Sequence, residues 1–455
     1  MTPTSAPPTR VRYSILAMLC LLAMITYMDR AANGSAKPLI MGELGIDADD
    51  FFQVFLAFQL AYALFEIPSG WLGDTVGPRS TLLRVVLWWS LFVAVTGLTA
   101  MPLPGGVYIG FTALIVVQFL FGVGEAGAFP NMAKALYNWF PASQRGFAKS
   151  AVWMSARFMG GMTPLLWVLL VDLGGMTWRQ AMWLFAGVAV AWCAVFYAVF
   201  RNKPAEDPAV NPAELALIDE GRTPPSGPVR VPWGMLVRSR NLWAVCGMFV
   251  VTNFCWYFLM YNHPSAMKAE FADWNATPGG KLMLALLSGA PLLVGMYGCF
   301  LGGTLSDVYI RRTGDRKWGR RLPGMIGYGM AGVCYFAAAG VKLADPGNLW
   351  AFAGLLMLMG FFNDLIMAPA WAVCQDIGRE YAATVSGAMN MFGNLFGAVT
   401  GILVTGLLLK NYPGTDGILV CFTLYGLVYF VGVGLWLLID ASKPIAPDDQ
   451  AAASH

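Results

Sequence analysis

Several ionisable residues lie where the surrounding sequence is apolar enough to sit inside a lipid bilayer. They are Asp29, Arg30, Glu66, Glu125, Arg157 and Asp364. A charged side chain at the centre of a bilayer costs about 2.5–3.5 kcal/mol on insertion scales, so such a residue is expected to be functional and to have a partner. Arginine keeps its proton and offers a planar fork of donors suited to a carboxylate, whereas aspartate and glutamate can carry a proton. The set therefore suits an anion-binding site coupled to proton transfer.

The pairing among these charges stays open at this stage. Asp29 and Arg30 are adjacent, about 100° apart around a helix, so neither simply neutralises the other across a turn. Arg157 either binds the charge of a ligand or is the permanent counter-ion of Glu125 on a neighbouring helix. Asp364 is either a third proton carrier, a fixed partner of Arg157, or a polar spot that breaks its helix. A purely structural network of these side chains is the remaining alternative.

Polar stripes at helical spacing supply further candidates. Asn253 and Tyr257 are four residues apart, as are Ser386, Asn390 and Asn394, so each set lines one face of a helix. Amide and phenol groups are suited to reading the hydroxyl groups of a sugar-like solute. Hydrogen bonds between helices are the alternative use of such residues.

These residues are carried by a chain whose composition points to membrane insertion. Of its 455 residues, 57% are hydrophobic and only 12% are charged, roughly half the charged fraction of a soluble domain. Twelve apolar runs are long enough to cross a bilayer, which takes about 20 residues each. They lie near residues 13–36, 52–73, 80–101, 107–128, 147–171, 179–200, 241–263, 282–305, 322–342, 349–374, 384–409 and 417–438.

The runs fall into two sets of six, which predicts an all-α membrane protein with two pseudo-symmetric halves. The predicted parts are a tail (1–12), the first half (13–200), a charged and Pro-rich linker (201–240), the second half (241–438) and a second tail (439–455). Arg and Lys residues, among them Arg145 and Lys149, gather in the tails, the linker and alternate loops. The positive-inside rule therefore predicts that both termini are cytoplasmic, in the inner membrane if the source is bacterial.

A short pattern recurs at matched places in the two halves. Gly70 and Asp74 end the second run, with Arg79 five residues on; Gly303 and Asp307 end the eighth, with Arg312 five residues on. A glycine near a helix end allows close packing of a neighbouring helix. The aspartate and arginine can pair with each other, or with helix ends, across the interface between the halves. A pairing available in one conformation favours that conformation, so we expect Gly70, Asp74, Arg79, Asp307, Arg312 and Arg145 to act as a gate.

Two motifs complete a resemblance to the major facilitator superfamily. Tyr27-Met28-Asp29-Arg30 and Gly124-Glu125-Ala126-Gly127-Ala128-Phe129-Pro130 look most like its anion:cation symporter branch, which takes up organic anions with protons. The likeness covers roughly residues 13–440. It implies that Arg30 anchors the substrate, that Asp29 and Glu125 bind protons, and that Tyr62 and Trp371 line the site.

The sequence departs from that branch at two places that face the cavity in relatives. Glu66-Ile67-Pro68 stands where glutamine often precedes the proline, and Tyr261-Asn262-His263-Pro264 stands where Trp-x-Pro is more usual. These departures leave the identity of the transported anion open.

The expected function is proton-coupled symport of a small organic anion, such as a sugar acid, by alternating access. The partners we expect are the anion, protons and the lipid bilayer, with no nucleic acid, metal or cofactor, and the protein is expected to be monomeric and not an enzyme. Gly122-Val123-Gly124-Glu125-Ala126-Gly127 matches a dinucleotide-binding pattern, but it lies inside an apolar helix and not after a strand. The alternatives are proton-driven efflux of drugs or metabolites, which predicts no central arginine pair, and a transporter-like sensor.

Overall fold

The computed structural model describes residues 7–101, 110–220, 231–261, 274, 277–345, 348–412 and 414–445. The regular elements in these ranges are all helices. The first half contains α1 (Val11–Leu44), α2 (Ala48–Thr75), α3 (Pro78–Thr96), α4 (Phe111–Glu125), α5 (Ala128–Trp139), η1 (Ala142–Gln144), α6 (Arg145–Trp167), the π-helix η2 (Val168–Asp172) and α7 (Trp178–Val199).

A linker of short helices connects the first half to a second half of similar helical organisation. The linker contains η3 (Pro204–Glu206), α8 (Pro212–Asp219) and α9 (Trp233–Arg238). The second half contains α10 (Arg240–Tyr261), α12 (Pro278–Thr313), α13 (Arg316–Ala344), α14 (Leu349–Leu365), α15 (Met367–Gly378), η5 (Arg379–Tyr381), α16 (Ala382–Phe392), the π-helix η6 (Gly393–Ala398), α17 (Val399–Asn411) and α18 (Thr415–Leu438).

Ten stretches of the described residues are long and apolar enough to cross a bilayer. The longest, Trp350–Asn411, has 62 residues and provides two crossings, because about 20 apolar residues suffice for one. Helix α10, with 22 residues, provides the remaining crossing. The protein is therefore an all-α membrane protein of twelve transmembrane helices, which confirms the predicted fold class.

The fourth span of each half is broken by a proline. Pro130 cannot donate a hydrogen bond to the carbonyl of Ala126, and the helix is interrupted there, between α4 and α5. Pro369 has the same effect between α14 and α15. Glu125 is the last residue of α4 and Asp364 the second-last residue of α14, so both carboxylates lie at these breaks.

The most extensive contacts between the halves are those of α6 with α12 and of α2 with α16. Glycines let the backbones approach closely at both crossings. A Cβ atom on Gly161 would lie 2.9 Å from the carbonyl oxygen of Gly289, and one on Gly70 would lie 2.5 Å from that of Ala383. Larger side chains at these positions would push the halves apart.

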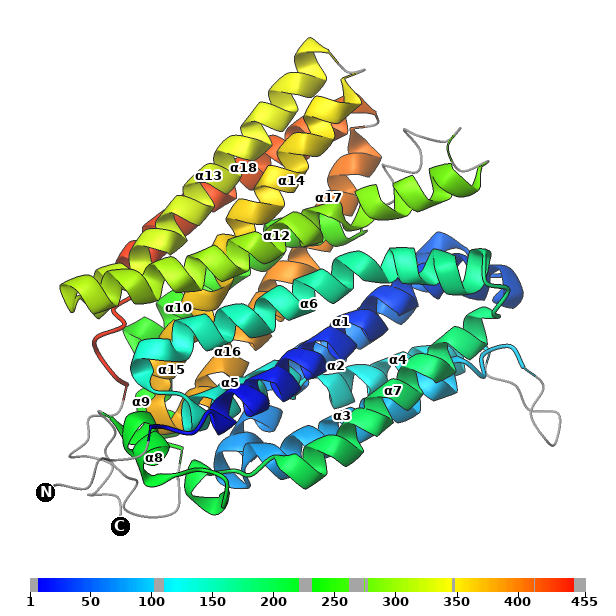
Figure 1. Ribbon diagram of the computed structural model, residues 1–455. Coiled ribbons are helices and arrows are strands. Elements are labelled where there is room, and N and C mark those ends of the chain that lie inside the picture. Colours follow the sequence, from blue (N-terminus) through cyan, green and yellow to red (C-terminus); the bar gives the residue numbers. More distant parts are fainter. Residues whose placement is uncertain are drawn as a thin grey trace, which may run out of the picture.

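The halves converge at the end of the bundle that carries α8 and α9 and diverge toward the opposite end (Figure 1). We call the first of these the linker end. It is where the described chain begins, before α1, and where it ends, after α18.

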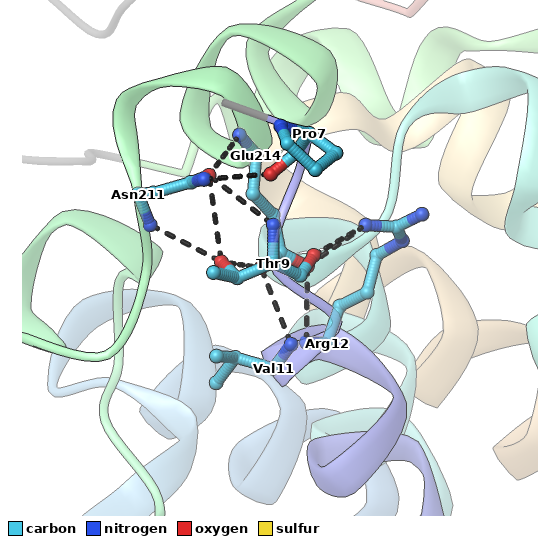
Figure 2. Close-up of polar contacts among 6 residues, drawn as sticks. All are labelled: Pro7, Thr9, Val11, Arg12, Asn211 and Glu214. Atoms are coloured by element: carbon cyan, nitrogen blue, oxygen red, sulfur yellow. Dashed lines mark hydrogen bonds and ion pairs between the residues drawn. The ribbon is translucent and has the colours of Figure 1, made fainter. Parts of the chain in front are cut away.

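The first part of the linker is fastened to the start of α1 by one buried carboxylate. Glu214 in α8 accepts hydrogen bonds from the Thr9 hydroxyl at 2.5 Å and from the backbone N–H groups of Val11 and Arg12 at 3.2 and 3.3 Å (Figure 2). The Arg12 guanidinium completes the contact with an ion pair of 2.8 Å. Asn211 adds two reciprocal hydrogen bonds with Thr9. A carboxylate at the N-terminus of a helix is favoured by the helix dipole, so α8 is held to the first half.

Candidate functional site

Arg30 on α1 and Glu125 at the end of α4 form an ion pair inside the first half. The distance from Nε of Arg30 to Oε1 of Glu125 is 2.7 Å. The guanidinium lies over the ring of Tyr62 on α2, at 4.3 Å from its centroid. Arginine stacks on aromatic faces as well as binding carboxylates, so Tyr62 fixes the plane of the guanidinium.

The two members of this pair differ in their access to solvent. The Arg30 side chain is 20% exposed, whereas that of Glu125 is 1% exposed. The Oε2 atom of Glu125 has no hydrogen-bond partner among the described residues. The arginine is therefore the more accessible member of the pair, and the carboxylate is the enclosed one.

Asp29, the neighbour of Arg30 in the sequence, faces the protein interior. It is 1% exposed, and the donor beside its carboxylate is the indole N–H of Trp89, which is also buried. Its charged neighbour is Glu125. A buried carboxylate beside another carboxylate and with one neutral donor is costly as an anion, and a bound proton removes that cost.

Arg157 on α6 is paired with Asp364 on α14 of the opposite half, and not with Glu125. The fork is bidentate, with Nε to Oδ2 at 2.6 Å and Nη2 to Oδ1 at 2.8 Å. The third nitrogen, Nη1, donates to the Tyr27 hydroxyl at 2.6 Å, and the guanidinium lies 4.5 Å from the ring centroid of Trp256. The side chain is 1% exposed, so this arginine is enclosed by protein in the present conformation.

The Asp364 carboxylate is held in turn by a short chain of hydrogen bonds. Asn363 donates to its Oδ1 at 3.1 Å, and the Tyr429 hydroxyl donates to Asn363 at 2.7 Å. These supporting bonds are in the second half, and the bond from Arg157 to Tyr27 is in the first half. The Arg157–Asp364 pair therefore joins hydrogen-bonded side chains of both halves. It fixes the two halves to each other at the depth of the helix breaks.

The polar stripe of the eleventh span reaches across to α2. Asn390 on α16 donates to the Tyr62 hydroxyl at 3.1 Å and also to the Glu66 carboxylate. All three side chains are buried. Tyr62 thus links this group to Arg30, and the departure at Glu66 places a carboxylate beside the site.

The stripe of the seventh span lies next to it. Asn253 on α10 is buried and donates to Asn394 on η6 at 3.3 Å. Gln59 on α2 donates to the same Asn394 oxygen at 2.8 Å. Tyr257 is one turn further along α10, and its side chain, like residues 262–264, lies outside the described part of the structure.

Trp371 on α15 belongs to an aromatic plug between the halves, formed with Phe129 and Trp153. Phe129 and Trp153 stack at 4.5 Å between ring centroids, and Trp371 lies 5.5 Å from Trp153 and 5.9 Å from Phe129. All three are at most 4% exposed. Lys149 is one of the basic residues that the sequence predicts to be on the cytoplasmic side. Its side chain is buried against Trp371, because α6 begins inside the bundle.

Asp74 joins the halves at the linker end. Its carboxylate accepts hydrogen bonds from the backbone N–H and the hydroxyl of Thr384 at 2.8 and 2.7 Å, and from the N–H of Ala383 at 3.3 Å. These groups are in the first turn of α16, so Asp74 caps a helix of the other half. Lys134 pairs with Asp74 at 3.3 Å and also donates to the carbonyl of Glu380.

Asp307 makes the reverse contact from the second half. It accepts the backbone N–H of Phe147, in the first turn of α6, at 2.8 Å, and it pairs with Arg320 at 2.9 Å. Arg320 pairs with Asp376 as well, at 2.9 Å. Gly146 is required here, because a Cβ atom at that position would collide with the Asp307 carboxylate.

The arginines of the repeated pattern do not cross between the halves. Arg79 donates to the carbonyl of Tyr197, within the first half, and Arg312 is exposed. Arg145 is buried at the start of α6, 4.2 Å from the ring centroid of Tyr137. The sequence left two pairings open for Asp74 and Asp307, with the arginines of the pattern or with helix ends. In the structure both aspartates bind helix ends.

Several partners of Asp74 and Asp307 are not evident from the sequence pattern. Lys134, Arg320 and Thr384 lie outside the repeat, each on a helix other than the two that carry it. A weak signal exists for Lys134, since it follows Pro130 on an apolar helix. Nothing in the spacing marks Thr384.

Comparison with known proteins gives a consistent result. The model of the Major Facilitator Superfamily matches residues 19–401. A protein of Cupriavidus necator named "probable sulfoacetate transporter" is 31% identical over 450 residues, covering 97% of both chains. A protein of Escherichia coli named "probable galactarate/D-glucarate transporter" is 28% identical over 460 residues, covering 96% of both.

Among solved structures, a proton:xylose symporter of the major facilitator superfamily, bound to 6-bromo-6-deoxy-D-glucose, has the same fold. The TM-score is 0.72 at 13% sequence identity, covering 97% of this chain and 98% of the other. At that identity the likeness concerns the arrangement of the helices.

Proposed function

Because the chain belongs to the major facilitator superfamily and is a membrane transporter, we propose that it is a proton-coupled symporter of a small organic anion. The observation that carries the proposal is the Arg30–Glu125 pair, in which the arginine is 20% exposed and the carboxylate is buried behind it. Arg30 is thus the group that an entering anion meets.

The Arg30–Glu125 pair supplies a physical reason why anion binding is coupled to proton binding. While Glu125 is ionised, it satisfies Arg30 and repels an incoming anion. A proton on Glu125 removes the competing charge, and the anion can then take its place on the guanidinium. Asp29, buried beside Glu125, is the second proposed proton carrier. The occupied site closes readily, because no unpaired charge is left to bury.

The substrate class follows from the same chemistry. A guanidinium binds carboxylate or sulfonate oxygens through parallel donors, and the amides and phenols around it suit hydroxyl groups. Tyr62, Asn253, Tyr257, Trp371 and Asn390 are the proposed lining residues. The names of the relatives support small acids of this kind, so sulfoacetate, galactarate and D-glucarate are the first candidates.

We further propose that the linker end is cytoplasmic, as the distribution of Arg and Lys predicts. Gly70, Asp74, Asp307 and Arg145 then seal the cytoplasmic side, with Arg79 and Arg312 at its margin, and the present conformation is closed toward the cytoplasm. Alternating access would proceed by rocking of the two halves around the site.

Arg157 and Asp364 form a second carboxylate–arginine pair with a different proposed role. Because it joins the halves and is enclosed, it stabilises the present conformation. A proton on Asp364 would release Arg157, which becomes available to an anion only after the pair opens.

Uptake into proteoliposomes tests the function. We expect accumulation of at least one of the three candidate acids under an inward proton gradient, and none of a neutral sugar. Arg30→Ala should raise KM at least about 30-fold, because removing one partner of a buried charge pair costs 2–5 kcal/mol or more. Arg84→Gln is the control, since Arg84 is exposed and bonds to Ser80 of its own helix.

The proposal fails if Arg30→Ala transports the acid with unchanged KM. It also fails if accumulation by the unmodified protein is insensitive to collapse of the proton gradient.

A further inference from the structure

A group of hydrogen-bond donors lacks acceptors on the linker-end side of the aromatic plug. Lys149 is fully buried, and its Nζ atom has no hydrogen-bond partner among the described residues. The same is true of the indole nitrogen of Trp371. The hydroxyl of Ser386 has the thiol of Cys374, a weak hydrogen-bonding group, beside it. An unpaired ammonium in a protein interior is costly, so its presence requires an explanation.

These donors surround one small region between the halves. Lys149 lies 4.4 Å from the ring centroid of Trp371 and interacts with Cys374, which in turn contacts Ser386. Lys149 comes from α6 in the first half, whereas the other three come from α15 and α16 in the second. The region therefore opens when the halves separate at the linker end.

Its position relative to the central site follows from the helix repeat. Lys149, Trp153 and Arg157 are spaced by four residues and lie along one face of α6. At a rise of 1.5 Å per residue, Lys149 is about 12 Å nearer the linker end than Arg157. Trp153 lies between them as part of the plug. Lys149 is thus a buried cation on the linker-end side of the plug.

We propose that Lys149, with the Trp371 indole N–H and the Ser386 hydroxyl, forms a second anion-binding site that receives the acidic group of the substrate after the plug opens. This inference rests on the proposed function. In the closed conformation the cation–π contact with Trp371 holds the ammonium. A carboxylate or sulfonate is a stronger partner for it. The site therefore binds anion in the conformation open to the linker end and is empty of it in the closed one.

Transport measured separately from each side of the membrane tests this site. The variants are Lys149→Met, which keeps length and apolar volume, and Lys149→Arg, which keeps the charge. With the candidate acid that the unmodified protein transports, Lys149→Met should raise KM about 10-fold or more for substrate presented at the linker end. KM at the opposite end should change less than 2-fold, and Lys149→Arg should restore most of the loss.

The controls separate this inference from the proposed function. Arg30→Ala should raise KM from both sides, and failure of that result concerns the central site alone. Arg84→Gln should leave both values unchanged. If Lys149→Met lowers the maximal rate equally in both directions with both KM values unchanged, Lys149 has only a structural role and the second site is refuted. A melting temperature equal to that of the unmodified protein confirms that the variant is folded.

Discussion

The carboxylate of Asp74 in the first half accepts the backbone N–H of Thr384 in the second half at 2.8 Å. Asp307, its counterpart in the repeat, accepts the backbone N–H of Phe147 in the opposite direction. Each half thus caps a helix of the other, so the two-fold repeat produces two equivalent contacts at one end of the bundle. Charge-assisted hydrogen bonds of this kind contribute about 1.5–3 kcal/mol each.

Asp74→Asn should weaken closure of the linker end, because the amide keeps the shape but loses the charge that faces the helix N-terminus. We expect the rate of Cys374 alkylation by a maleimide to rise about 10-fold, since Cys374 is fully buried on α15, which packs against α16. The measurement uses a variant in which the other seven cysteines are replaced. Asp315→Asn, which removes the charge of a cap that serves only α13, is the matched control, and an equal rise there would contradict the assignment.

Glu125→Gln should separate transport from proton coupling. The amide oxygen can still accept the Arg30 hydrogen bond, so exchange of substrate across the membrane should continue. Accumulation driven by a proton gradient should be lost, because the side chain no longer carries a proton. Exchange and net uptake are compared in the same proteoliposomes. Accumulation against the substrate gradient by this variant would exclude Glu125 as the proton carrier.

Asp364→Asn should destabilise the protein by about 3–5 kcal/mol, because it leaves Arg157 buried without its counter-ion. Replacing both residues by apolar ones, in Arg157→Met with Asp364→Leu, should recover most of that loss. Thermal unfolding in detergent measures both. If the double variant is stable and still transports, the pair is structural only; a stable but inactive double variant supports a role in the transport cycle.

Glu214→Ala should loosen the attachment between α8 and the start of α1. Four donors lose their common acceptor, and Arg12 loses its partner. We expect faster proteolysis of the linker and a lower melting temperature, with KM unchanged because the site is distant. Glu220→Ala, at an exposed residue just after α8, is the control. Equal proteolysis of both variants would show that the carboxylate does not hold the linker.

The membrane fold follows from the sequence because its signals are local. Apolar runs of about 20 residues and the repeated Gly70 and Asp74 pattern depend only on the order of residues along the chain. The charges inside the spans are equally visible, since Asp29, Arg30 and Glu125 stand out against apolar neighbours.

The partner of each charge depends on how helices are rotated and which ones are adjacent, and spacing does not encode that. The sequence left a ligand, Glu125 and Asp364 open as partners of Arg157, and the fold selects Asp364 by bringing α14 of the other half against Arg157 on α6. Lys149 was missed for a related reason. It lies near the end of an apolar run, where a lysine usually reaches water, but the first turn of α6 is covered by the second half.

The Glu214 clamp also decides how the polypeptide can be divided. Since α8 ends at Asp219 and stays with α1, and α9 begins at Trp233 beside α10, only the short stretch between them has to connect two separately anchored bodies. Cutting the gene within codons 221–230 should therefore give two fragments, each a complete six-helix unit. Co-expression of the pair would then reveal how much of the assembly depends on covalent continuity.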